Sequence, residues 1–275
     1  MVDFKDLIEK LFQIYTEDAF NRYNGDYYLS TPSEDEGYIN FCFSKDDEGC
    51  FIESGESEWY HPYFASDLVV ERAKKVFNIS CNEKRRCFVP LQSLEEDHVK
   101  DCVRRYGTFK TITSGDAILK GFIIDYKCEK IASKYSYCKN SFEEFIEEFI
   151  QSDKNWKMFE SVEKQGDKFI AKTRFLDSNC QPICIDLLYD KKGVTVSYKI
   201  PCEEFKQTKT FEKLTTFFMD YFEEDNCVGG VFAYPESIRN IKDVLFGIVM
   251  TANGEMFLDV PFEEYNPNDE PNIFD

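Results

Sequence analysis

Apolar side chains recur at the spacing of an amphipathic helix at the start of the chain and again near its middle. A helix in the first stretch places on one face Phe4, Leu7, Ile8, Leu11 and Phe12. The same spacing recurs 138 positions later at Phe142, Phe145, Ile146, Phe149 and Ile150. Ser141 and Glu144 have the spacing of a capping box at the start of the second stretch. The pattern therefore predicts a helix at the start of each half of the chain.

Short segments typical of antiparallel strands follow each of these helices. In the first half they cover 27–30, 38–43 and 50–53, and in the second half 169–175, 183–189 and 194–200. Hairpin turns are predicted at DDEG and DKKG, which end in Gly49 and Gly193. Glycine is favoured at such turns because it reaches positive φ without steric cost.

Later segments continue the parallel between the halves. A second amphipathic helix is predicted over 69–77 and over 214–222, and each half is expected to close with a hairpin, turning at Gly115 and at Gly254. One more helix is predicted for SLEEDHVKDCVRRYG, capped by Ser93 and Glu96. This agreement in order indicates an internal duplication with a period near 140 residues.

We therefore predict an α+β fold made of two tandem copies of an α-β-β-β-α-β-β antiparallel-sheet domain, packed as a pseudo-dimer. The N-terminal repeat covers 1–139, the C-terminal repeat 140–265, and a polar tail 266–275. No linker rich in proline or glycine separates the halves, so we expect them to pack together. The element order and the acidity resemble the secretion-chaperone-like α+β fold. That resemblance implies a small acidic cytoplasmic protein that binds unfolded or extended partners, and it assigns no functional residue.

Charge narrows the choice of partner. The chain has 52 acidic and 33 basic side chains, for a formal net charge of −19. By segment, the net charge is −12 over 1–67, +6 over 68–139 and −13 over 140–275. The overall field disfavours direct binding of nucleic acid and favours a partner with a basic surface. The basic segment 68–139 either neutralises its acidic neighbours within the fold, the favoured interpretation, or forms a binding face of its own.

Cysteine usage and apolar runs indicate a cytoplasmic protein. The eleven cysteines include no CxxC pair, and Cys180 and Cys184 lack the further ligands of a zinc site. We expect reduced thiols, no metal and no cofactor. The longest apolar stretch, Val244–Ala252, is much shorter than the roughly 20 residues of a membrane helix, and the N-terminus carries Asp3 and Asp6 where a signal peptide is basic.

One pattern resembles an enzyme site. Asp116, Asp125 and Lys127 have the order of two metal-binding carboxylates and a lysine in restriction-type nucleases. The corresponding segment of the second half ends in Asp259-Val-Pro261 without a lysine, which favours solvated turn acids instead. Nucleotide-binding glycine loops, zincin motifs and serine-hydrolase elbows do not occur in the sequence.

Acidic and aromatic side chains adjoin in the stretch that follows the first hairpin. The candidate partner-binding residues are Glu53, Glu56, Glu58, Trp59, Tyr60 and Tyr63. Such a surface attracts a cationic partner through ion pairs and cation–π contacts, whereas the alternative is that the aromatic rings pack beneath a loop. The sequence thus predicts a non-enzymatic protein-binding protein of the chaperone, immunity or anti-defence type. The alternative is a metal-dependent nuclease. A DNA-encircling clamp ranks last, because the FEEFIEEF helix is acidic.

Overall fold

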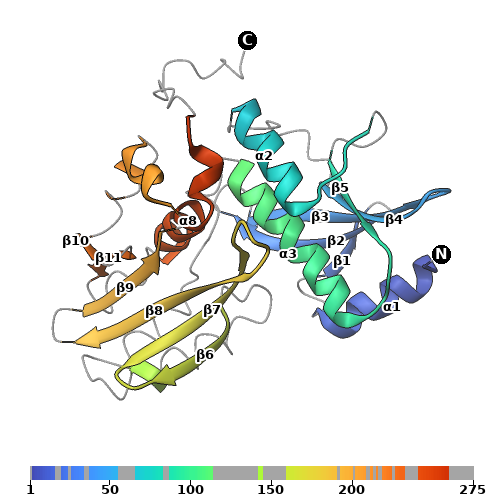
Figure 1. Cartoon of the computed structure of the whole chain (residues 1–275). Coiled ribbons are helices and arrows are strands. Elements are labelled where there is room, and N and C mark those ends of the chain that lie inside the picture. The colour runs from blue at the N-terminus through green and yellow to red at the C-terminus, as the bar shows by residue number, and fades with distance from the viewer. Residues whose placement is uncertain are drawn as a thin grey trace, which may run out of the picture.

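The computed structural model contains two antiparallel sheets with helices between and beside them (Figure 1). The structure describes residues 2–15, 20–23, 26–33, 37–54, 66–82, 87–113, 142–144, 159–190, 193–200, 202–208, 211–212, 215, 219–224, 227–232 and 241–259.

The first half of the chain forms a five-stranded sheet and three helices. Its elements are α1 (Phe4–Ile14), β1 (Phe20–Tyr23), β2 (Asp26–Ser33), β3 (Gly37–Asp46), β4 (Gly49–Ser54), α2 (Asp67–Phe77), β5 (Phe88–Leu91) and α3 (Glu96–Thr113). The strands lie in the order β1-β2-β3-β4-β5, and all neighbours are antiparallel.

The second half forms a six-stranded antiparallel sheet. Its elements are β6 (Phe159–Gln165), β7 (Lys168–Leu176), β8 (Pro182–Asp190), β9 (Gly193–Lys199), the 3₁₀ helix η1 (Glu203–Gln207), β10 (Met219–Glu224), β11 (Cys227–Phe232), α8 (Ile241–Ala252) and the 3₁₀ helix η3 (Gly254–Phe257). The strand order is β10-β11-β9-β8-β7-β6. Phe142–Glu144 form part of a helical turn ahead of this sheet.

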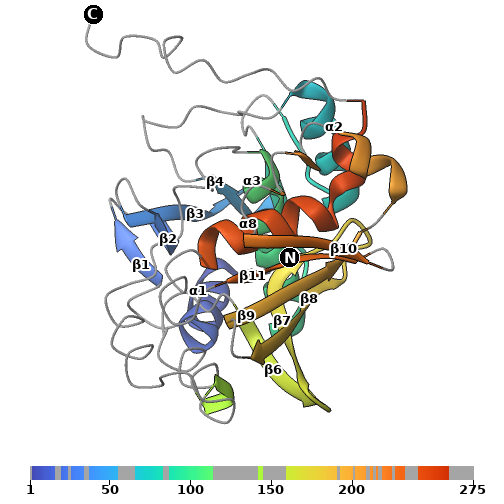
Figure 2. The ribbon, with the colours of Figure 1, turned by 90° about the vertical axis from the view of Figure 1, so that its left-hand side faces the viewer.

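Helix α3 lies between the two sheets and joins their cores (Figure 1). It contacts β4 and β5 of the first sheet, β7 of the second sheet, and helices α2 and α8. Tyr106 and Phe109 are completely buried in a cluster of apolar side chains that both halves supply. Helix α8 packs against β9, and Figure 2 shows it beside β10 and β11. Because one continuous core serves both sheets, unfolding of either half exposes apolar surface of the other.

The predicted helices 4–12, 69–77 and 93–107 and the six predicted strands are confirmed, as is an α+β fold with antiparallel sheets. The α1 N-cap is Asp3, whose carboxylate accepts a hydrogen bond from Lys5 N at 2.8 Å. Helix α2 ends at Asn78, which has φ 54°. The hairpin turns also lie where predicted: Asp46 pairs with Gly49, whose φ is 146°, and Asp190 pairs with Gly193.

The closing hairpin predicted for the second half is wrong, because 248–257 lie in the end of α8, a turn at Asn253 and η3. The hairpin predicted for the first half is wrong at its start, where 110–113 form the last turn of α3. Gly115 lies outside the described residues. The described residues from Gly247 to Asn253 are all buried, so this part of the segment has no polar face and its sequence lacks helical periodicity. The Thr251 hydroxyl donates to the Gly247 carbonyl four residues earlier at 2.7 Å, in the pattern of a helical threonine.

The predicted helix over 214–222 is wrong at its C-terminal end. Tyr221 and Phe222 belong to β10, and Phe222 pairs with Gly229 of β11. Over so short a stretch, a few apolar residues fit both the 3.6-residue period of a helix and the two-residue period of a strand. The hydrogen bonds with β11 favour the strand. Ser93, predicted as a helix cap, instead accepts a hydrogen bond from Glu95 N at 3.1 Å just before α3 begins. The element order in the first half is therefore α-β-β-β-β-α-β-α, with one more strand before α2 than predicted.

The predicted boundaries at 139/140 and 265/266 lie outside the described residues. Within the part of the chain that the structure describes, helices are too short or too polar to cross a membrane.

Candidate functional site

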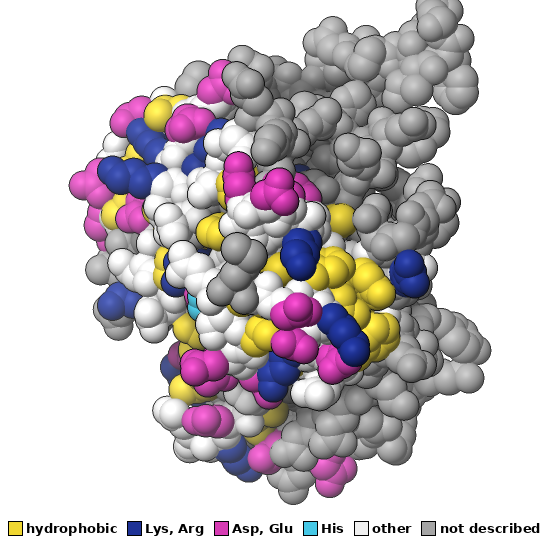
Figure 3. Space-filling model, turned by 90° about the vertical axis from the view of Figure 1, so that its right-hand side faces the viewer, with side chains coloured by type: hydrophobic (Ala, Val, Ile, Leu, Met, Phe, Trp, Pro, Cys, Tyr) yellow, Lys and Arg dark blue, Asp and Glu magenta, His cyan; other side chains and the backbone are white. Residues whose placement is uncertain are grey.

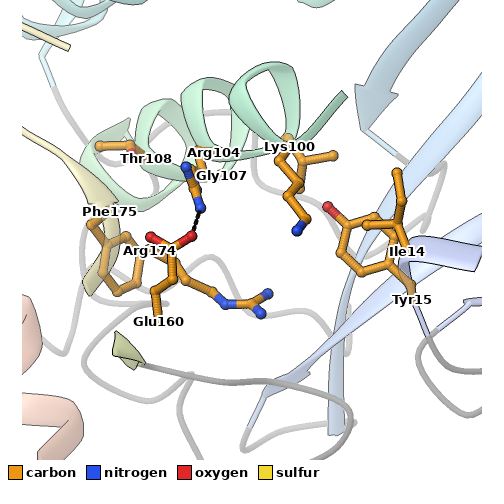
Figure 4. Close-up of a pocket in the computed structure, with 10 residues that line it drawn as sticks. Ile14, Tyr15, Lys100, Arg104, Gly107, Thr108, Glu160, Arg174 and Phe175 are labelled. Carbon is orange, nitrogen blue, oxygen red and sulfur yellow. Dashed lines mark hydrogen bonds and ion pairs between the residues drawn. The ribbon is translucent and has the colours of Figure 1, made fainter. Parts of the chain in front are cut away.

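A pocket of about 270 Å³ lies where the end of α1, one face of α3 and strands β6 and β7 meet (Figure 4). Helix α3 contributes side chains at i, i+3, i+4, i+7 and i+8, which share one helical face. The lining residues are Ile14, Tyr15, Lys100, Val103, Arg104, Gly107, Thr108, Glu160, Arg174 and Phe175. The pocket therefore lies at the junction between the two halves, and neither half forms it alone.

Cationic groups outnumber acidic ones in this pocket. Its lining includes Lys100, Arg104 and Arg174 but one carboxylate, Glu160. Figure 4 shows the ends of Lys100 and Arg174 and the Tyr15 hydroxyl directed toward the space among these elements. A local excess of positive charge is unexpected in a chain of net charge −19, because the overall field attracts cations and repels anions.

Glu160 holds one side of the pocket in place through two ion pairs. Its Oε1 pairs with the Arg104 guanidinium, and its Oε2 lies 3.0 Å from Lys172 Nζ. Burial alone raises the pKa of this carboxyl, but Lys172 and Arg104 outweigh it and hold the pKa below its usual range. Glu160 is therefore ionised at neutral pH and fixes Arg104 against β6.

Tyr15 supplies a protonated hydroxyl on the side of the pocket opposite Glu160. Burial raises the pKa of its phenol to about 12, although Arg174 and Arg104 act in the opposite direction. The phenol stays neutral over the physiological range and can donate a hydrogen bond. Lys100 Nζ lies 2.7 Å from Glu96 Oε1, one turn earlier on α3. The mouth of the pocket thus combines an ammonium group, a guanidinium group and a phenol hydroxyl.

Buried hydrogen bonds hold α3 of the first half, and the turn that follows α8 in the second half, against β7. The pairing of β7 with β8 shifts register between Lys172 and Leu176. Side chains of two helical segments satisfy the Leu176 backbone: its N–H donates to Thr108 Oγ1 at 3.1 Å, and its carbonyl accepts from Asn253 Nδ2 at 3.1 Å. These bonds lie beside Phe175, so they fix one wall of the pocket.

Arg72 of α2 makes a second connection. Its Nη1 donates to the Leu258 carbonyl at 2.6 Å and to the Met256 carbonyl at 3.2 Å. The basic side chain thus satisfies backbone carbonyls at the end of η3, across the junction from its own helix.

The candidate partner-binding residues are mostly outside the described part of the chain. Glu53 lies near the end of β4, half-buried, and pairs with Cys42 and Phe88 of the neighbouring strands. The other five residues lie outside the described part of the chain, namely Glu56, Glu58, Trp59, Tyr60 and Tyr63.

The nuclease pattern Asp116, Asp125 and Lys127 also lies outside the described residues. Among the residues that are described, no three His, Cys, Asp or Glu side chains are placed to hold a metal ion. The Cys180 and Cys184 thiols donate to different backbone carbonyls, those of Val76 at 3.3 Å and Pro182 at 3.7 Å.

The sequence pattern does not identify the pocket as a site. Arg104 stands out only as a member of the basic segment, and Tyr15, Lys100, Glu160 and Arg174 belong to no motif. The one available signal is the i, i+4 spacing of Lys100 and Arg104 within a predicted helix. In comparisons with known proteins, no family model, no curated protein and no solved structure matches this chain.

Proposed function

We propose that the chain is a non-enzymatic binding protein that acts by occupying a macromolecular partner with a basic surface. The observation that carries this proposal is how the basic segment is used within the fold. Arg105 pairs with Asp101 at 2.7 Å, Lys74 with Glu71 at 2.7 Å, and Lys100 and Arg104 with carboxylates as described above. Apart from Arg104, which pairs with Glu160, these cations pair with acids of the basic segment itself, so they leave most of the acid excess elsewhere in the chain uncompensated.

The distribution of charge on the surface supports the same proposal. On the face shown in Figure 3, acidic and basic side chains of the described residues are interspersed, and no continuous basic area covers it. Binding of a phosphate backbone requires clustered Lys and Arg side chains, whereas a basic protein partner is attracted by the acid excess.

The ionisation states favour binding over catalysis. A nucleophile or general base works best when its pKa lies near neutrality. Burial, followed by the neighbouring Cys87 thiol, raises the pKa of Cys81 to about 12. Burial, followed by Asp101, raises the pKa of Cys102 to about 11. These thiols and the Tyr15 phenol are protonated at neutral pH, so none of them has the ionisation state of a catalytic nucleophile or general base that works at that pH.

In this proposal, the pocket at the junction of the two halves is a binding site for one anionic group. Arg174 supplies charge, and so does Lys100 through the N–H donors that its pair with Glu96 leaves over, while the Tyr15 and Thr108 hydroxyls supply hydrogen bonds without a change of protonation. A volume of about 270 Å³ suits a group of a few heavy atoms, not a whole macromolecule. The fitting chemistry is an oxygen anion, either a carboxylate or a phosphate.

We expect partner binding to depend strongly on salt. With a partner captured from the native host and then purified, the association rate should fall about tenfold or more between about 50 and about 300 mM salt, because screening removes electrostatic steering. Trp59→Ala with Tyr60→Ala should weaken binding while thermal unfolding stays cooperative. Stopped-flow or surface-plasmon measurements follow the rate. Partners that are acidic, or association rates that ignore salt, would contradict the proposal.

The anion site has a separate test. Inorganic phosphate and acetate are titrated calorimetrically into the wild type and into Arg174→Gln, Lys100→Gln and Lys168→Gln. The first two substitutions should weaken binding about tenfold or more by removing a charge-assisted contact. Lys168 lies on the same strand as Arg174 but pairs with Asp186 away from the pocket, so Lys168→Gln should bind like the wild type. Equal binding by all variants would remove the anion site and leave the partner proposal intact.

We further propose that the halves are tandem copies of one domain packed as a pseudo-dimer. Each sheet contains a four-strand meander, β1–β4 or β6–β9. In each, a later strand pairs antiparallel with the fourth, β5 with β4 and β11 with β9, and a helix follows it, α3 or α8. Strand β10 is the addition in the second half. The pocket then lies at the seam of the pseudo-dimer, where the two copies present different side chains.

A further inference from the structure

The segment between α2 and β5 brings two cysteines together in an antiparallel pairing. Ser80 and Phe88 exchange both backbone hydrogen bonds, at 3.0 and 2.8 Å. In antiparallel strands the next pair outward is a non-hydrogen-bonded pair, whose Cα atoms are about 4.5 Å apart. Cys81 and Cys87 occupy these positions. That separation lies inside the range that a disulfide spans without backbone movement.

The side chains follow from this backbone geometry. The Sγ atoms of Cys81 and Cys87 are 2.8 Å apart. Cys87 is buried, and its carbonyl accepts a hydrogen bond from the Tyr106 hydroxyl of α3 at 3.2 Å. Cys81 is exposed, so a soluble oxidant can reach it. One thiol is thus anchored to the core and the other is accessible.

We propose that Cys81 and Cys87 are a site of reversible oxidation, at which an intrachain disulfide forms. The oxidant is a low-molecular-weight disulfide such as oxidised glutathione. The Cys81 thiolate attacks one of its sulfurs and releases one glutathione thiolate. The Cys87 thiolate then attacks Cys81 Sγ in the mixed disulfide and releases the second. The two protein thiols lose two electrons and two protons, and oxidised glutathione becomes two molecules of reduced glutathione.

Local charge and burial set the pH dependence of this reaction. Burial and the Cys87 thiol raise the pKa of Cys81, whereas the Lys74 ammonium lowers it by favouring the thiolate. Because the pKa of Cys81 in the folded state lies far above neutrality, the reactive thiolate is scarce at pH 7. As long as the pH stays below this pKa, the thiolate fraction rises about tenfold for each unit by which the pH is raised. We therefore expect oxidation to accelerate from pH 7 to pH 9. Lys74→Gln should slow it at both pH values without changing the number of thiols that react.

The sequence offers a direct readout of the bond. The segment that the disulfide closes contains Lys84, Arg85 and Arg86, so trypsin separates Cys81 from Cys87. The resulting peptides, VFNISCNEK and CFVPLQSLEEDHVK, stay joined only through a disulfide. The folded chain is equilibrated with mixtures of oxidised and reduced glutathione, alkylated, digested and analysed by mass spectrometry. We expect the joined pair, about 2 Da lighter than the sum of the two reduced peptides, and its loss on treatment with excess reduced glutathione.

Two variants control the experiment. Cys184 is exposed, and its thiol donates to the Pro182 carbonyl. Cys184→Ser should leave the joined peptides unchanged, whereas Cys81→Ser should abolish them. A mixed glutathione adduct on Cys184 in the wild type shows that the oxidant was effective. If Cys81 and Cys87 are both alkylated under conditions that modify Cys184, or if Cys81 accumulates only as a glutathione adduct, the proposal is wrong.

Discussion

Replacing Asn253 by alanine is expected to destabilise the folded chain by about 2–4 kcal/mol. The side chain is completely buried, and its Nδ2 donates to the Leu176 carbonyl at 3.1 Å and to the Val249 carbonyl at 3.0 Å. Truncation removes both bonds and leaves a buried carbonyl at the junction without this donor. The change should appear as a lower urea midpoint with an unaltered denaturant slope.

Two further substitutions separate hydrogen bonding from packing at this position. Asn253→Asp preserves the shape but turns a carboxylate oxygen toward two carbonyls, so it should destabilise more than Asn253→Ala at pH 7. Burial raises the folded-state pKa of that carboxyl above its unfolded value, so the excess penalty should shrink as pH falls and the group becomes protonated. Asn179 is exposed in the β7–β8 turn, and Asn179→Ala should change stability by less than about 0.5 kcal/mol. Similar effects of Asn253→Ala and Asn179→Ala would show that the junction bonds contribute little.

The elements that were predicted correctly are those with one buried and one solvated face. Helix α1 buries Leu7, Ile8 and Leu11 and exposes Lys5 and Glu9, so its apolar period is visible in the sequence. Strand β7 alternates in the same way, with Phe169, Ala171 and Thr173 buried. The turn at Gly49 was predictable because its φ of 146° requires glycine.

The incorrect predictions concern segments whose side chains are buried on every side of the backbone. The described side chains of α8 and the last turn of α3 are buried whatever direction they face, and even Lys110 is only 6 % exposed. A segment without a polar side carries no helical period, and beside a glycine its pattern predicts a hairpin instead. Tertiary contacts, not local pattern, decide the conformation of such segments.

The pocket was not predictable because its residues are distant in sequence. Tyr15, Arg104, Glu160 and Arg174 come from four separate segments, and their meeting depends on how α3 packs against β7. That packing includes the buried bond between Thr108 and the Leu176 N–H, and Asn253 bonds the Leu176 carbonyl from the turn after α8. Neither residue belongs to a recognisable motif. A sequence predicts such a site only once the contact between the two sheets is known.

Gly254→Ala should destabilise the chain by about 1–3 kcal/mol through a steric clash. A Cβ atom at this position would lie 2.5 Å from Cγ of Phe205 and 2.6 Å from Cδ1 of the same ring. The ring cannot withdraw easily, because Phe205 is completely buried and packs edge-to-face on Phe211 with centroids 5.4 Å apart. The destabilisation therefore comes from steric overlap and not from backbone strain, because Gly254 does not have a positive φ.

A double-mutant cycle tests this cause. Phe205→Leu removes part of the ring, so Gly254→Ala should cost much less in that background, with a favourable coupling energy of about 1 kcal/mol or more. Gly166 is the matched control, since it has φ 63° and no described atom lies within 4 Å of the position that a Cβ atom would take there. Gly166→Ala should destabilise through backbone strain alone, by about 1 kcal/mol, and equally in both backgrounds. If Phe205→Leu leaves the cost of Gly254→Ala unchanged, the close approach of η3 to η1 is not what requires glycine at position 254.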